Sequence, residues 1–270
     1  MAASSNVASE AFQYRLEQTS KEMAKAVKEI VNSSYFDKEV CRSENLKVSQ
    51  AYCLLWQDSE SGDVDGRKIS VETNGGAAAA VLIDLVVLGK VEVEIEPNKT
   101  LGIKNDKILL KVIDDNPTGT YLDTALFDKI IEHHHKHPTR PDKVKDWIYH
   151  DVSHEKKKHY CSTITLDSLV GLGILEMKEN LFGRKYPTVN QGLEDQLVSQ
   201  IRGVTLEEES PNGYILALLT LARYSDNLLS LRDPVLEKHF TKEEYRKVKQ
   251  KINELVGIGK SKEKKIEKND

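Results

Sequence analysis

The residues best suited to chemistry in this chain are histidines, which cluster in two stretches. His133 and His137 are four residues apart, so on a helix they lie one turn apart, a spacing that can chelate zinc or nickel. No cysteine pair or carboxylate stands at ligand spacing beside them, and a histidine just before Pro138 also suits a helix C-terminus. We therefore expect no metal site. The second stretch, which we expect at the surface, contains His150, His154 and His159.

Sequence motifs for catalysis are absent. The chain has no G-x-S-x-G, no P-loop and no H-E-x-x-H. The glycine pair Gly171 and Gly173 stands between an apolar run and a strand-like run, where a glycine more often ends a helix than cradles a phosphate. We expect a protein that is not an enzyme and needs no cofactor.

Composition indicates a soluble, helix-rich protein. The chain has 270 residues, 39% hydrophobic and 30% charged, with a net charge of −4 and three scattered cysteines. Those cysteines favour a reducing compartment over a disulfide framework. No run approaches the roughly 20 apolar residues of a membrane span, and residues 1–14 do not resemble a secretory signal. Any membrane contact is therefore expected to be peripheral.

An internal repeat indicates which elements position the polar residues. Residues 85–93, LVVLGKVEV, align with residues 169–177, LVGLGILEM. Each copy reads as an apolar helix ended by a glycine, which adopts the left-handed cap conformation at low cost, followed by a short strand. In the first copy, residues 91–96 alternate apolar and acidic, as expected of a half-buried strand. A helix followed by a β-wing, made twice, is the plan of winged-helix-like proteins.

The remaining pattern is mostly helical. The first repeat helix is expected over residues 76–88, and its wing is a hairpin with a turn at 97–100 and a return strand near 108–113. Thr118 or a neighbour is expected to cap the helix at 121–135, and the second wing turns near 180–183. Further helices are expected at residues 10–31, 48–56, around 147–148, and at 192–201, 212–224 and 241–256.

The same sequence motifs together resemble the Golgi phosphoprotein 3 family. The segments AAVLIDLVVLGKVEVE, DDNPTGTYLDTAL, VKDWI, LVGLGILE, YPTVN and GYILALLTLARYSDNLL occur in the family's order, over about residues 46–256. The resemblance implies a mainly α fold, a single globular domain of packed helices with β-hairpin wings. It also implies a place at the cytosolic face of the Golgi membrane. There the family binds phosphatidylinositol 4-phosphate and retains glycosyltransferases by their cytosolic tails.

The family's lipid-binding positions are replaced in this chain. The resemblance implies a tryptophan and three arginines around the headgroup, and arginine suits this role because its planar fork binds phosphate oxygens in pairs. By our alignment these positions hold Ile69, Ala78, His159 and Ser162. None matches, so none is carried over as a headgroup ligand of the family's kind.

Basic residues flank the replaced positions. They form two clusters, which are either ordinary surface lysines or a shifted phosphate site: Arg67 and Lys68, and Lys156, Lys157, Lys158 and His159. Because lysine holds phosphate as a point charge, a shifted site predicts weaker and less selective lipid binding.

The second wing could touch a membrane. Leu181 and Phe182 beside Arg184 and Lys185 form a small apolar tip with basic flanks, which suits an anionic interface. The alternative is that the two apolar residues close the local core. The arginine cluster near the N-terminus of the family is not found in residues 1–14, which weakens the expectation of tail binding.

Two functional hypotheses are compatible with these patterns. The first is a peripheral Golgi adaptor acting in enzyme retention and vesicle trafficking, whose partners are a phosphoinositide membrane, enzyme tails and a second copy of the chain in a homo-oligomer. The second is an interaction module of the same fold without lipid binding. Nucleic acid is not expected as a partner, because the repeat helices lack Arg, Asn and Gln and the chain is acidic. The expected division is an extension at 1–40, the domain at 41–257 and a basic tail at 258–270.

Overall fold

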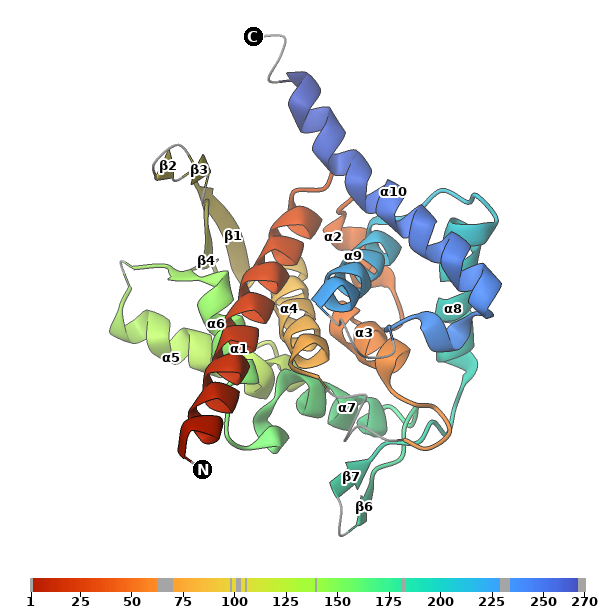
Figure 1. Cartoon of the computed structure of the whole chain (residues 1–270), viewed down its shortest axis with the longest axis horizontal. Coiled ribbons are helices and arrows are strands. Elements are labelled where there is room, and N and C mark those ends of the chain that lie inside the picture. The colour runs from red at the N-terminus through yellow and green to blue at the C-terminus, as the bar shows by residue number, and fades with distance from the viewer. Residues whose placement is uncertain are drawn as a thin grey trace.

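Helix α4 (Val71–Val87) lies at the centre of the fold. The computed structural model describes residues 2–62, 70–97, 99–100, 103–104, 106–138, 140–180, 183–228 and 234–266. Every α4 residue from Glu72 onward is buried, as expected of a helix that is apolar on all sides. The elements packed around it include α1 (Ala2–Val31), α3 (Val48–Trp56), α6 (Val144–Val152), α7 (Cys161–Gly171) and α9 (Gly213–Leu228) (Figure 1).

Helix α4 begins at Val71, five residues before the predicted start at 76. The hydroxyl of Ser70 accepts the backbone N–H of Thr73 (3.1 Å), and the Thr73 hydroxyl accepts the N–H of Ser70 (2.9 Å). This reciprocal capping satisfies two of the free donors at the start of the helix.

A buried carboxylate connects α4 to α3. Asp84 accepts the backbone N–H groups of Val48 (2.8 Å) and Ser49 (3.0 Å) and the Ser49 hydroxyl (2.6 Å). It therefore caps the first turn of α3 from a neighbouring helix, and α3 begins at Val48 as predicted. Burial raises the pKa of Asp84 to about 6, although these donors lower it.

The first wing follows α4 directly. Strand β1 (Val91–Glu96) pairs antiparallel with β4 (Lys107–Val112), and β4 also pairs with the short β5 (Asp142–Lys143). The predicted turn at 97–100 is wrong. Beyond Pro97, β2 (Lys99–Thr100) pairs with β3 (Ile103–Lys104), so the hairpin continues past its proline in a second short ladder.

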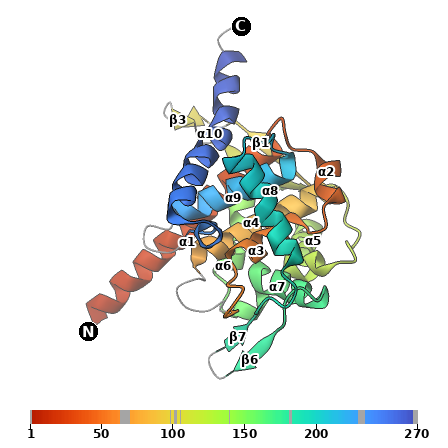
Figure 2. The ribbon, with the colours of Figure 1, turned by 90° about the vertical axis from the view of Figure 1, so that its right-hand side faces the viewer.

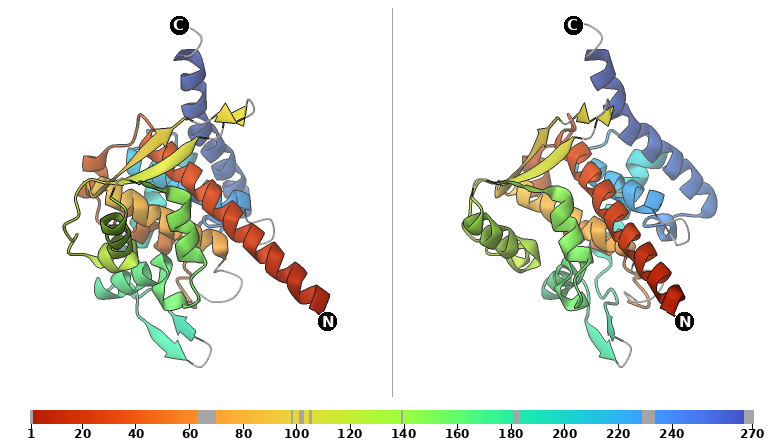
Figure 3. Two further views of the ribbon diagram at one scale, coloured as in Figure 1. Left: turned by 90° about the vertical axis from the view of Figure 1, so that its left-hand side faces the viewer. Right: turned by 60° about the vertical axis from the view of Figure 1, so that its left-hand side comes forward.

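The second wing is shorter. Strand β6 (Lys178–Asn180) pairs with β7 (Gly183–Lys185), which confirms the expected turn position, and an isolated bridge joins Leu175 to Thr188. The two wings lie at opposite ends of the molecule in Figures 1 and 3. The expected mainly α fold with β-hairpin wings is confirmed.

Helix α1 covers one side of α4. It packs on α4, α6 and α9, and it buries Leu16, Met23 and Val27. Arg15 on α1 pairs with Glu72, a side chain only 2% exposed in the first turn of α4 (Nη2 to Oε2, 2.6 Å). The residues expected as an N-terminal extension thus include a helix that contacts the centre of the fold. The first turns of α1 and the last turns of α10 (Lys242–Ile266) extend away from the helical body (Figure 2).

The helix after residue 118 is capped by a neighbour of Thr118, as the prediction allows. The Thr120 hydroxyl accepts the backbone N–H of Leu122 (3.3 Å), and the Thr118 hydroxyl accepts that of Thr120 (3.1 Å). The Asp123 carboxylate accepts the backbone N–H groups of Thr118 (2.8 Å) and Gly119 (2.9 Å), so it holds the loop before the helix. The first turn, η1 (Asp123–Phe127), is π-helical, and α5 (Asp128–Lys136) continues it. The other elements are α2 (Lys38–Ser43), η2 (Lys157–His159), α8 (Gly192–Leu206) and η3 (Glu237–His239).

Candidate functional site

The second predicted basic cluster lies in the connection between α6 and α7. Lys156, Lys158 and His159 are exposed, and η2 carries the backbone of Lys157. The amide of Lys156 donates to His154 Nδ1 (3.1 Å), which helps to order the connection. Arg67 and Lys68 of the first predicted cluster lie outside the part of the chain that the structure describes, and so does Ile69. The side chain of Lys157 is also outside it.

The second wing lies at the same end of the molecule as this connection (Figures 1 and 3). Arg184 on β7 is held by acidic groups, 3.3 Å from the Asp167 carboxylate on α7 and 4.0 Å from that of Glu179. Part of its charge is therefore already neutralised within the protein. Leu181 and Phe182 lie outside the described residues, and Lys185 is half-buried on β7.

A lysine that the sequence patterns do not single out stands beside the basic connection. The ammonium nitrogen of Lys129 on α5 is buried without a hydrogen-bond partner among the described residues. Burial, and then the charge of Lys129, lowers the pKa of His150. Desolvation, and then the charge of Lys158, lowers the pKa of His159, with Lys129 contributing. Three lysine charges thus converge on this end of α6 and α7. No local signal distinguishes Lys129, because only the packing of α5 and η1 brings it there.

Asp151 anchors the start of α7 inside this basic region. The carboxylate is fully buried, and its Oδ1 accepts the backbone N–H of Cys161 (2.9 Å) while Oδ2 has no partner among the described residues. Burial raises the pKa of Asp151 to about 6, and the charge of Lys129 opposes that rise. Asp151 therefore fixes the geometry of the connection, and its single negative charge offsets only part of the positive charge of the three lysines.

Two of the replaced family positions do not reach the surface. Ala78 is fully buried in α4, and Ser162 is 1% exposed, with its hydroxyl donating to Asn74 Oδ1 (2.6 Å). Neither side chain can contact a headgroup. His159 alone of the described positions is exposed.

The histidines at the end of α5 make protein contacts. His133 Nδ1 lies 2.7 Å from the Asp142 carboxylate, and its ring packs against His137 with centroids 4.7 Å apart. The described part of the chain holds no group of three or more His, Cys, Asp or Glu side chains arranged for a metal ion. Across the same residues, no helix has the length and hydropathy to cross a bilayer.

The architecture and its basic end define a class: a helical domain with two hairpin wings, one of which stands beside a cluster of cations. The family model of Golgi phosphoprotein 3 (GPP34) matches residues 48–267, most of the chain. The chain therefore belongs to the Golgi phosphoprotein 3 family. No curated protein matches it. Family membership supports a Golgi-associated role of the Golgi phosphoprotein 3 kind.

Proposed function

We propose that this protein is a peripheral adaptor at the cytosolic face of the Golgi membrane. It binds a membrane containing phosphatidylinositol 4-phosphate, and it acts in enzyme retention and vesicle trafficking through the cytosolic tails of Golgi glycosyltransferases and through self-association. Its family supports the general role. The observation that carries the membrane contact is the basic connection between α6 and α7, where Lys156 and Lys158 are exposed and the charge of Lys129 acts on His159. This connection lies at the end of the molecule that also bears the β6–β7 wing (Figure 1).

The chemistry of the site indicates a modest, salt-sensitive affinity. Lys156 and Lys158 are exposed point charges, each worth about 1 kcal/mol at an anionic lipid surface. Salt screens such contacts, whereas the buried Lys129 ammonium is screened less. We therefore expect a general attraction to anionic lipid through Lys156 and Lys158, to which the buried Lys129 adds positive charge at longer range rather than a headgroup contact.

Liposome co-sedimentation tests this proposal, with and without phosphatidylinositol 4-phosphate at low and physiological salt. Lys156→Glu with Lys158→Glu should weaken binding by at least about thirtyfold, since two contacts of roughly 1 kcal/mol each are reversed. The matched control, Lys247→Glu with Lys249→Glu, makes the same charge change on the exposed face of α10. Equal loss in both variants would mean attraction by overall charge alone.

A second candidate function is favoured by the buried Ala78 and Ser162. Because neither position offers a phosphate ligand, the chain is also suited to act as a protein-interaction module that lacks phosphoinositide binding. Failure of the wild-type protein to sediment with phosphoinositide liposomes at low salt would select this function.

A further inference from the structure

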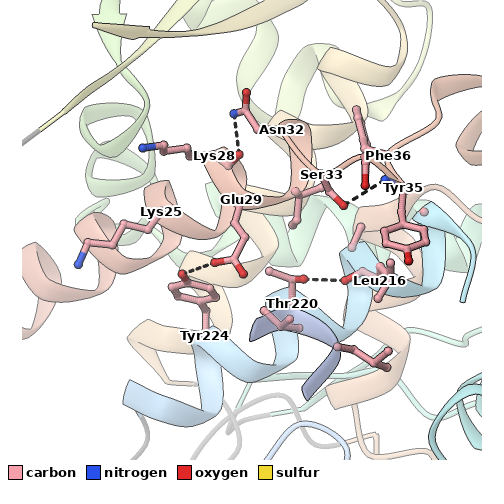
Figure 4. A pocket seen from close by; sticks show the side chains of 16 residues that line it. Lys25, Lys28, Glu29, Asn32, Ser33, Tyr35, Phe36, Leu216, Thr220 and Tyr224 are labelled. Carbon is pink, nitrogen blue, oxygen red and sulfur yellow. Dashed lines mark hydrogen bonds between the residues drawn. The ribbon is translucent and has the colours of Figure 1, made fainter. Parts of the chain in front are cut away.

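A pocket of about 380 Å³ lies on the side of the fold where α1 meets α9 and α10. Its walls come from the last turns of α1, the connection to α2, one face of α9 and the middle of α10 (Figure 4). This volume falls in the lower part of the roughly 300–1,000 Å³ range of small-molecule sites. The pocket and the basic connection are built from different elements, so the inference made here does not rest on the proposed membrane contact.

The walls of the pocket are mainly apolar. Ile30, Leu216, Ala217 and Val256 are core residues that face it. Apolar atoms beside an unfilled space lose dispersion contacts on that side, which favours an apolar occupant.

Most polar groups at the pocket are already satisfied within the protein. The Thr220 hydroxyl donates to the Leu216 carbonyl oxygen (2.7 Å), and the Asn32 amide donates to the Lys28 carbonyl oxygen (2.8 Å). The Lys28 ammonium pairs with Asp106 at 2.8 Å, and the Lys25 ammonium pairs with Glu22 at 2.5 Å. The two lysines at the pocket therefore direct their charges to carboxylates outside its lining.

Glu29 is the exception. Its Oε2 accepts a hydrogen bond from the Tyr224 hydroxyl (2.7 Å), but its Oε1 is buried without a partner among the described residues (Figure 4). Burial, and then the hydrogen bond to Glu29, raises the pKa of Tyr224, so this phenol remains a donor at neutral pH. A buried carboxylate oxygen without a donor is costly, and a cationic donor satisfies it best.

We propose that this pocket binds a small amphipathic primary amine. The ammonium group donates to Glu29 Oε1, and the short hydrocarbon body packs between α9 and α10 against Leu216 and Val256. The fit follows from charge: the lining lysines are paired elsewhere, and the carboxylate is the group that lacks a donor. An anion or a neutral molecule offers that oxygen no cationic donor.

The test compares hexylamine, 1-hexanol and hexanoate as probes by isothermal titration and by protein-observed NMR at pH 7. We expect the amine to bind at about millimolar Kd, as a fragment of this size should, and the alcohol and the acid to bind at least about tenfold more weakly. Resonances of Tyr224 and Leu216 should shift with the amine in the wild-type protein, which tests the site without any variant. Equal binding of amine and alcohol, or no shift at these residues, would overturn the proposal.

Glu29→Gln removes the negative charge while keeping the shape of the side chain. It should abolish the preference for hexylamine over 1-hexanol. The control, Glu17→Gln, neutralises an exposed glutamate on the same helix outside the pocket and should leave the preference unchanged. Retention of the full preference in Glu29→Gln would contradict the assignment of the ammonium to this carboxylate.

Discussion

The two helix–wing units share one local geometry and differ in everything around it. In the first unit, Gly89 has φ +74°, and the N–H of the next residue, Lys90, donates to the Leu85 carbonyl oxygen (2.9 Å). In the second unit, Gly173 has φ +69°, and the N–H of Ile174 donates to the Leu169 carbonyl oxygen (3.1 Å). These are equivalent helix caps, each closed by a left-handed glycine. The repeat in the sequence is therefore a true structural repeat at this point.

Burial separates the two units. Helix α4 is buried along nearly its whole length and anchors α3 through Asp84. The equivalent position in α7, Ser168, makes lighter contacts: its hydroxyl accepts from the Gln50 amide (3.1 Å) and donates to the Thr165 carbonyl oxygen (2.6 Å). The first unit builds the core, and the second, with its short wing, presents a surface beside the basic connection. Equivalent local motifs thus acquire different roles from what packs on them.

The largest effect should come from removing the anchor of the first unit. Asp84→Ala leaves two backbone N–H groups of α3 without an acceptor and removes one of the two partners of the Ser49 hydroxyl, and we expect it to lower the free energy of unfolding by about 3–5 kcal/mol. Ser168→Ala should cost only about 1 kcal/mol. Urea denaturation followed by circular dichroism measures both. Similar losses in the free energy of unfolding would mean that Asp84 and Ser168 contribute equally to stability.

Two buried carboxylates should make the stability of the fold depend on pH: Asp84, which lies within α4, and Asp151, which lies before α7. Burial raises the pKa of Asp151, as of Asp84, from 3.8 to about 6, so the folded state holds the proton more tightly than the unfolded state. The stability that this proton contributes is complete at a pH below the unfolded-state pKa and is lost as the pH rises through the folded-state pKa. His239 works the other way in the same window, because burial lowers its pKa to about 4.

Asp151→Asn isolates this effect in the second unit, since the amide oxygen still accepts the Cys161 N–H. Relative to the variant, the wild-type protein should lose roughly 2–3 kcal/mol of stability between about pH 4 and pH 6. Urea midpoints measured at closely spaced pH values check the prediction. A constant difference across this range would show that Asp151 keeps its ordinary pKa.

The smallest effect tests the equivalence of the two caps. An added Cβ at Gly89 or Gly173 meets nothing within 4 Å, so only the left-handed backbone opposes a side chain. Gly89→Ala and Gly173→Ala should each cost about 1–2 kcal/mol and agree within roughly 0.5 kcal/mol. Thermal unfolding of the two variants compares them. A clearly larger loss at one position would break the equivalence of the units.

Much of the fold could be predicted because the relevant signals are local. The helix at Val48–Trp56, the strand at Val91–Glu96 and both glycine caps follow from apolar periodicity and from one special residue each. The early start of α4 was missed because its capping pair, Ser70 and Thr73, carries no apolar pattern.

The candidate sites were harder to predict, because they depend on contacts between distant segments. Lys156 and Lys158 were found since they stand together in the sequence. Lys129 was not predicted, because it lies on a different helix. It is notable only because the fold buries its ammonium nitrogen without a hydrogen-bond partner among the described residues. The pocket at Glu29 was missed for the same reason: its walls come from three helices that only the fold brings together.

The sequence by itself determined the helices, the hairpin wings and their repetition, because hydrogen bonding and φ preferences act between residues a few positions apart. Only the tertiary structure decided which repeat is core and which is surface, and which charged groups of the described chain are left without partners. Burial and desolvation depend on every neighbour in space, and those neighbours come from segments as distant as α1 and α10.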